Sequence, residues 1–198
     1  MTNKERFQAL CAQQIHRDGL ASLMSWLEAS DFYEAPASTR FHGSYPGGLV
    51  EHSLHVYDEL NRLRKAYPEV PMSDETAAII SLFHDLCKVN MYLPEKRNRK
   101  NKDGVWEQYD AYSIQEKFCF GGHGSKSVFL VQTFLKLTPE EAVAINCHMG
   151  AFGGDQYVGK SFEQYPMAWL LHVADGAATY ILEGKKTFVL KEIRLSIQ

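Results

Sequence analysis

Apolar residues recur every three to four positions through most of this chain, and polar residues fill the spaces between them. That spacing matches one face of an α-helix, so the pattern predicts an all-α fold. The stretch 31–48 interrupts the pattern with prolines and a Gly47-Gly48 pair, and it is predicted to be a loop. The predicted helices cover residues 4–16, 20–29, 49–66, 123–137, 138–150 and 166–182, and a further helix begins after Ser73 and carries His84.

Two of the predicted helices have a recognisable start. Ser73 can accept a hydrogen bond from the first turn, and two acidic residues follow it at the positive end of the helix dipole. Thr138 and Glu141 have the spacing of a capping box, with Pro139 suited to the first helical position. The C-terminal stretch 185–198 alternates apolar and polar residues only weakly, and its structure is left open.

Residues 90–112 depart from the helical pattern. Valine and aromatic residues flank Lys102-Asp103-Gly104, and Asp-Gly is a frequent turn in two-stranded hairpins. We therefore predict a small β-hairpin inserted between helices. Its basic tip is either a solvated edge that prevents pairing with other sheets or a surface that steers an anionic substrate. The basic residues are Lys96, Arg97, Arg99, Lys100 and Lys102.

The composition fits one soluble domain spanning residues 1–198, with 45% hydrophobic and 23% charged residues. A formal net charge of −3 does not favour nucleic acid as a partner, but it allows a small phosphorylated substrate at a local positive site. The N-terminal residues lack the apolar stretch of a secretory signal, and no run reaches the roughly 20 apolar residues that span a bilayer. We therefore expect a cytoplasmic protein without membrane contact. Its reduced thiols, each a small buried hydrophobe, are Cys11, Cys87, Cys119 and Cys147.

Ionisable residues interrupt the apolar faces of several predicted helices, namely His52, His84, His148 and Asp175, and His123 opens a further helix. A single histidine on an apolar face is usually a packed core residue. An ionised aspartate in a core, however, costs several kcal/mol unless it has a partner. Because a divalent cation binds imidazole nitrogen and carboxylate oxygen together, one shared metal site would satisfy the whole set.

His84 and Asp85 are adjacent, so on a helix their side chains would point about 100° apart. Both can still reach one site that lies between them, and Asp85 could then bridge two ions. Lys88 lies one helical turn after His84 on the same face. A lysine beside metal ions suits binding of a phosphate oxygen.

Five segments carry a family resemblance. They read FHGSYPGGLVEHSLHV (41–56), LFHDLCKV (82–89), GGHGSKSVFLVQ (121–132), INCHMGAF (145–152) and WLLHVADGAATY (169–180). Together they resemble the HD superfamily of metal-dependent phosphohydrolases, in particular small stand-alone members with the order H…HD…H…H…D. The resemblance covers about residues 41–182 and implies an HD-domain helical bundle, with residues 90–112 as an insertion.

The resemblance also implies a ligand set and a reaction. One metal would be held by His52, His84, Asp85 and Asp175, and a second by Asp85, His123 and His148. The two cations, whether iron, manganese, zinc or nickel, would supply a hydroxide that attacks phosphorus, with Asp85 and Lys88 as catalytic residues. The implied substrate is a nucleotide or another small phosphorylated molecule. The predicted substrate-binding residues are Lys88, His42, Lys96 and Arg97.

Two other functions stay open. Some HD proteins with this ligand set resemble di-iron oxygenases, whose turnover depends on oxygen. A nucleotide-sensing HD module without turnover is the other alternative. His172, three residues before Asp175, would either orient a ligand or only pack beside the site. The metal identity and the oligomeric state are left open by the sequence.

Overall fold

The computed structural model describes residues 1–184, which are mainly helical with one two-stranded antiparallel sheet, in agreement with the predicted helices and hairpin. None of these helices combines the length and the apolar character needed to cross a membrane. The C-terminal stretch 185–198 lies outside the described residues. The elements are α1 (Asn3–Gln14), α2 (Leu20–Ala29), α3 (Gly48–Ala66), α4 (Asp74–Leu82), β1 (Tyr92–Lys100), β2 (Trp106–Ile114), α5 (His123–Gln132), α6 (Pro139–Cys147), α7 (Val158–Gln164) and α8 (Pro166–Ala177).

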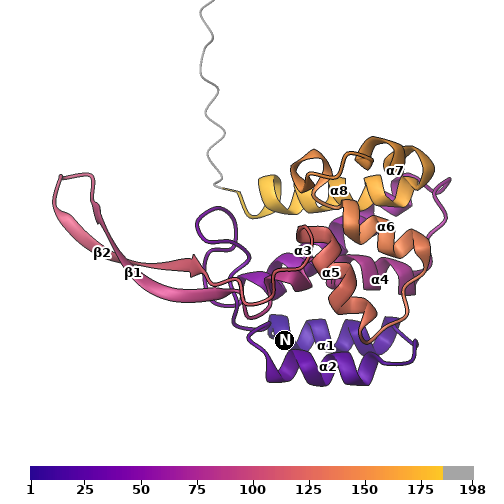
Figure 1. The fold of residues 1–198 in the computed structure, drawn as a ribbon, viewed down its shortest axis with the longest axis horizontal. Coiled ribbons are helices and arrows are strands. Elements are labelled where there is room, and N and C mark those ends of the chain that lie inside the picture. The colour runs from indigo at the N-terminus through magenta and orange to yellow at the C-terminus, as the bar shows by residue number, and fades with distance from the viewer. Residues whose placement is uncertain (185–198) are drawn as a thin grey trace, which may run out of the picture.

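Helix α3 runs through the middle of the helical body (Figure 1). The α1–α2 pair lies on one side of α3, and α8 lies on the other side. Buried aromatic rings pack α1 against the segments that follow α2 and α4. The ring centroid of Phe7 on α1 lies 4.9 Å from that of Phe32, after α2, and 5.9 Å from that of Phe83, after α4. Burial of each such ring contributes about 1.5–3 kcal/mol. The packing of α8 on α3 sets Asp175 beside His52, with 3.1 Å between Oδ1 and Nε2.

The predicted helix starts are confirmed. Ser73 caps α4, and its hydroxyl accepts a backbone N–H of the first turn. Thr138 and Glu141 form a reciprocal capping box at α6, with Pro139 as its first residue. Glu141 is also fully buried, and Arg17 pairs with its two carboxylate oxygens at 2.6 and 3.1 Å. This ion pair ties the α1–α2 connection to α6.

The hairpin occupies Tyr92–Ile114, two residues beyond the predicted end, and extends away from the helical body (Figure 1). Tyr92 pairs with Ile114 at its root, and Lys100 pairs with Trp106 near its tip. Gly104 in the connecting turn has a φ of 77°, which a residue with a side chain rarely adopts. The strands are exposed along most of their length.

The prediction that His84 and Asp85 lie on a helix is wrong. Helix α4 ends at Leu82, and the two residues form the turn before a 3₁₀ segment, Leu86–Lys88. The reason is burial, because every residue from Ala77 to Val89 is buried. A helix that packs on one side exposes part of its surface, so the chain must leave the helical path to bury so many successive side chains.

Helix α5 also ends earlier than predicted, at Gln132 instead of Leu137. Leu135 and Leu137 are both buried, yet on a continued helix they would point about 200° apart. The chain turns instead, and the Gln132 side chain accepts a hydrogen bond from the Leu137 N–H at 2.9 Å. Helix α6 likewise ends at Cys147 rather than near Gly150.

Two features of the C-terminal part were not predicted. Helix α7 is a short element before α8, and the predicted last helix changes type at Ala178, where a π-helical segment runs to Leu182.

The four cysteines are free, and three are buried as expected. Cys119 is exposed, contrary to its predicted burial, because it follows the hairpin in an irregular stretch.

Candidate metal centre

Asp85 lies at the centre of a buried cluster of histidine and carboxylate side chains. Its own side chain is 3% exposed. Asp85 Oδ2 is 3.4 Å from His84 Nε2 and 3.7 Å from His52 Nε2. His52 Nε2 lies 3.3 Å from His84 Nε2 and 3.1 Å from Asp175 Oδ1. The structure thus brings together, from α3, the turn after α4 and α8, the four residues predicted for one metal.

The other carboxylate oxygen of Asp85 faces two further histidines. Oδ1 lies 2.7 Å from His123 Nε2 and 3.5 Å from His148 Nε2. His123 is the first residue of α5, and His148 follows the last residue of α6. The two oxygens of Asp85 therefore point to two separate groups of imidazoles.

Backbone carbonyls set the tautomers of two of these histidines. His84 Nδ1 lies 2.7 Å from the carbonyl oxygen of Ser81, and His148 Nδ1 lies 2.7 Å from that of Ile145. Because a carbonyl only accepts, each Nδ1 donates its proton to that oxygen, and Nε2 is the ring atom left to take a cation or a second proton. His148 Nε2 is buried and has no hydrogen-bond partner within residues 1–184. A lone pair that faces a carboxylate without a donor between them fits a bound cation.

The spacing of the donor atoms also fits metal binding. Ligands bound to one cation at about 2.0–2.2 Å lie about 2.8–3.6 Å apart. In the group of His52, His84 and Asp175, His52 Nε2 lies 3.3 Å and 3.1 Å from the other two donor atoms, and in the group of His84, Asp85 and His148 the Asp85 oxygens lie 3.4 Å and 3.5 Å from the imidazole nitrogens. These buried clusters could bind divalent metal ions. Imidazole and carboxylate donors are compatible with iron, manganese, zinc or nickel.

Lys88 forms an ion pair inside the same cluster. Its Nζ lies 2.6 Å from Asp85 Oδ2. Burial alone would lower the pKa of Lys88, but the charge of Asp85 outweighs it and raises that pKa above its ordinary value. Burial likewise opposes ionisation of Asp85, but Lys88 and His84 hold its pKa well below the usual range. Both groups are therefore charged at neutral pH, and Lys88 also lines the cavity described below.

His52 lies between two carboxylates. Burial opposes a charge on its ring, yet hydrogen bonds with Asp175 and Glu183 outweigh burial and raise its pKa to about 9. The pKa of Asp175 is lowered, because its contact with His52 outweighs the opposing effect of burial. A proton and a cation therefore compete for His52, and metal binding there must release the proton.

Glu183 is a candidate functional residue that the sequence prediction missed. Its side chain is 4% exposed, and Oε1 lies 3.1 Å from His52 Nδ1 and 2.8 Å from His55 Nδ1. A carboxylate on the far nitrogen of a ligating histidine fixes the tautomer and the orientation of the ring. Glu183 lies eight positions after Asp175, and on a regular helix the two side chains would point about 80° apart around the helix axis. The π-helical segment between them changes this phase, and no pattern in the sequence marks that change.

Cys87 packs against His123 and retains its predicted role as a small hydrophobe. Its Sγ lies 3.3 Å from both ring nitrogens of His123. Equal distances to the two nitrogens place the sulfur over the face of the ring, away from the direction of either lone pair. Burial raises the pKa of the Cys87 thiol to about 12, which keeps it protonated at neutral pH.

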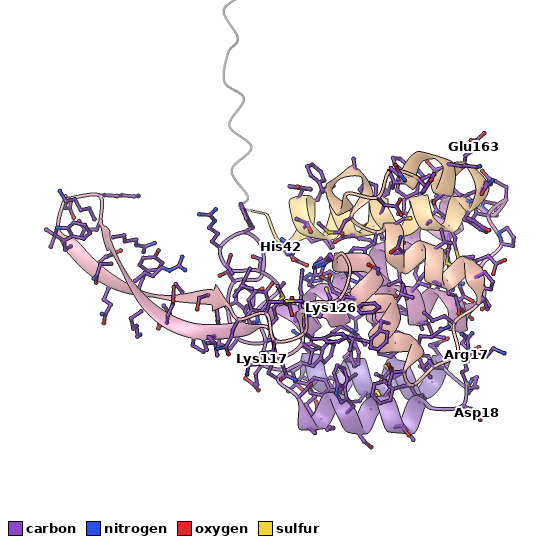
Figure 2. The ribbon with its side chains drawn as sticks, in the orientation of Figure 1. Arg17, Asp18, His42, Lys117, Lys126 and Glu163 are labelled. Carbon is purple, nitrogen blue, oxygen red and sulfur yellow. The ribbon has the colours of Figure 1, made fainter. Side chains whose placement is uncertain are left out.

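A cavity of about 380 Å³ opens onto the cluster, and His42 and His172 line it together with Lys88. Both ring nitrogens of His42 are buried without a partner among residues 1–184, and burial lowers its pKa to about 4. His42 lies between the root of the hairpin and the C-terminal end of α8 (Figure 2). His172 Nδ1 lies 2.7 Å from the backbone carbonyl oxygen of His148. His172 thus both lines the cavity and contacts the backbone of a candidate ligand.

Two other predicted substrate-binding residues lie on the hairpin. Lys96 pairs with Asp110, and Arg97 pairs with Glu95. Neither is among the residues that line the cavity. Their acidic neighbours balance their charge locally, so the structure offers less free positive charge at the hairpin than the sequence suggested. A role for Lys96 and Arg97 in substrate binding stays a prediction.

Comparisons with known proteins give one partial similarity. Among curated proteins, the dihydroneopterin 2',3'-cyclic phosphate phosphodiesterase of Methanocaldococcus jannaschii is 30% identical over 84 residues, which cover 41% of this chain and 31% of that protein. The chain thus matches less than a third of the length of this relative. No protein-family model matches the chain, and no solved structure matches it.

Proposed function

We propose that this chain is a metal-dependent phosphohydrolase of the HD type that hydrolyses a phosphoester of a small molecule. The observation that carries the proposal is the position of Asp85, whose two oxygens face separate groups of imidazole nitrogens inside a cavity. The unpartnered Nε2 of His148 supports it, because a buried lone pair beside a carboxylate requires a cation or a proton.

We assign the ligands as the family resemblance implies. One cation would be held by His52, His84, Asp85 and Asp175, and a second by Asp85, His123 and His148. When bound, two such cations supply a water of lowered pKa and neutralise charge on phosphoryl oxygens.

The chain's own residues then have separable roles. Asp85 holds the two halves of the centre together through its two oxygens. Lys88 is charged and lies at the floor of the cavity, so it would bind a phosphoryl oxygen and stabilise the negative charge that develops on it. Glu183 and the carbonyls of Ser81 and Ile145 orient the imidazoles.

The partial relative supports phosphoester chemistry, since its name describes cleavage of a cyclic phosphodiester. A phosphodiester is therefore included with phosphomonoesters among the candidate substrates. Nucleotides are the substrate class that the family resemblance favours.

The test is metal reconstitution followed by turnover. The chain is stripped with a chelator, loaded with iron, manganese, zinc or nickel in turn, and assayed with p-nitrophenyl phosphate, bis(p-nitrophenyl) phosphate and mononucleotides. We expect hydrolysis with at least one metal and loss of both bound metal and turnover in Asp85→Asn. Asp58→Asn on α3, which pairs with Arg6 away from the centre, is the matched control and should behave like the parent.

Two results would contradict the proposal. Absence of phosphoester turnover with every metal would support a sensing module, provided that the metal-loaded protein binds nucleotide. Turnover that requires iron and molecular oxygen would favour the di-iron oxygenase alternative.

A further inference from the structure

The cavity at the candidate metal centre is lined by two kinds of side chain. Its floor contains Asp85, Asp175 and Lys88, and its wall at the hairpin root is formed by Tyr92 and Ile114. The volume of about 380 Å³ lies in the range of sites that hold small organic molecules. A ligand that fills the cavity therefore meets both charged and apolar groups.

Three aromatic side chains surround the opening of this cavity. Phe41 comes from the loop after α2, Phe152 from the 3₁₀ turn after α6, and Tyr180 from the π-helical segment after α8. They are 78%, 85% and 72% exposed. Single exposed aromatic residues are common on protein surfaces, whereas these three come from separate segments and line one cavity. We call these residues the aromatic rim.

The positive charge of the cavity is limited. Within residues 1–184, Lys88 is the only lysine or arginine that lines it, and Asp85 and Asp175 line it as well. The guanidinium of Arg40 lies outside this lining, 5.4 Å from the ring centroid of Phe41. One phosphate group can be satisfied by Lys88 and by cations held at the floor. The second and third phosphates of a nucleoside triphosphate would find no further lysine or arginine in the described lining to pair with their charges.

We propose that the site takes a phosphate ester with a single phosphate group and one planar aromatic ring, which stacks on the aromatic rim. The assignment of a phosphate group to the substrate rests on the proposed function. The assignment of an aromatic ring rests on the aromatic rim alone. Stacking depends on the flat face of a ring and not on its hydrogen-bonding edge. The site should therefore accept different planar rings while rejecting polyphosphates.

The turnover test compares substrates that differ in one end only. For the parent, kcat/KM should be higher for AMP than for glycerol 1-phosphate, which also releases an alcohol, and at least about tenfold higher for AMP than for ATP. In a Phe41→Ala, Phe152→Ala double variant, kcat/KM for p-nitrophenyl phosphate should fall about tenfold or more, because each stacked ring contributes on the order of a tenfold effect. For glycerol 1-phosphate it should change less than about twofold.

Matched variants separate stacking from general damage. Tyr157→Ala removes an aromatic side chain that is 64% exposed outside the cavity lining, and it should behave like the parent. Phe41→Tyr keeps the ring and should retain the activity that Phe41→Ala loses. Equal loss for p-nitrophenyl phosphate and glycerol 1-phosphate, or equal activity on AMP and ATP, would overturn the inference.

A binding measurement separates this inference from the proposed function. Adenosine, which has a ring and no phosphate, should bind the parent in calorimetry or ligand-observed NMR and bind the double variant at least about tenfold more weakly. If no phosphoester is hydrolysed but adenosine binding depends on the rim, the proposed function fails and the ring site stands. Adenosine binding that is absent, or equal in parent and double variant, overturns the ring site whatever the turnover result.

Discussion

Raising the pH should destabilise the metal-free protein through His52. The pKa of this imidazole is raised to about 9 in the folded chain, where burial is outweighed by hydrogen bonds with Asp175 and Glu183. The pKa of an unfolded histidine is about 6.5. A raised folded-state pKa gives stability that is fully present below about pH 6.5 and is lost as the pH rises through about 9.

The size of the effect follows from these two pKa values. Between pH 6.5 and 8.5 the free energy of unfolding should fall by about 2 kcal/mol. For a chain of this size the loss corresponds to a decrease in Tm of about 4–8 °C. Burial lowers the pKa of His42 to about 4 and also lowers that of His123. Because their unfolded imidazoles still lose protons above pH 6.5, these two oppose the decrease by at most about 0.4 kcal/mol each. The hydrogen bond with Glu183 raises the pKa of His55, which adds to the effect of His52. The pKa of His148 is raised by Asp85 against the effect of burial, and this acts in the same direction as His52.

The assay is thermal unfolding of the chelator-treated protein at pH 6.5, 7.5 and 8.5, with and without added Mn²⁺ or Zn²⁺. A cation holds the imidazole neutral, and its affinity increases with pH, so the loaded protein should not show the decrease. His52→Gln should remove most of the decrease from the metal-free protein, whereas His16→Gln, at an exposed position, should not. A metal-free parent whose Tm is constant or rises across this window would refute the reasoning.

Three further predictions follow from the same geometry. Lys88→Ala should lower phosphoester turnover by roughly 10²-fold, the loss expected for one charge partner in the transition state, while metal content measured by mass spectrometry stays at the parent level; loss of metal would show that Lys88 is structural. Glu183→Gln should weaken metal binding about 10–100-fold in a chelator competition, because the tautomer of His52 is no longer fixed by a carboxylate; unchanged affinity would leave Glu183 as a packing residue. Arg17→Met should lower the free energy of unfolding in urea by about 3–5 kcal/mol, because it leaves Glu141 buried without its cation; a loss below about 1 kcal/mol would show that Glu141 is satisfied by its other hydrogen bonds.

The parts of the fold that depend on local sequence could be predicted. Helix starts at Ser73 and Thr138 follow from side chains that reach the next turn, and the hairpin follows from Asp103-Gly104 and its flanking residues. The gathering of His52, His84, Asp85, His123, His148 and Asp175 could be expected because buried ionisable groups need partners. Its geometry is set by helix packing, which periodicity alone does not determine.

The features that escaped prediction depend on contacts between distant segments. Helix α4 ends before His84 because the next residues are buried on several sides, a condition set by α3 and α5. Glu141 reads as a simple capping residue, and its pairing with Arg17 depends on how the α1–α2 connection meets α6. The aromatic rim comes from three separate segments whose convergence has no counterpart in the sequence pattern.

Each carboxylate in the centre faces a positive group of the chain itself, and Asp175 and Glu183 share one. Asp85 pairs with Lys88, and His52 can carry a proton between Asp175 and Glu183. Each of these carboxylates therefore has a positive partner even without a cation, which removes most of the cost of burying it. The fold consequently does not depend on metal in the way that a zinc finger does, where the unpaired ligands require the ion. A metal that binds must instead displace the proton of His52 and compete with Lys88 for Asp85. Lys88, released from Asp85, would then be free to bind the phosphate group of the substrate. Metal binding would therefore favour substrate binding.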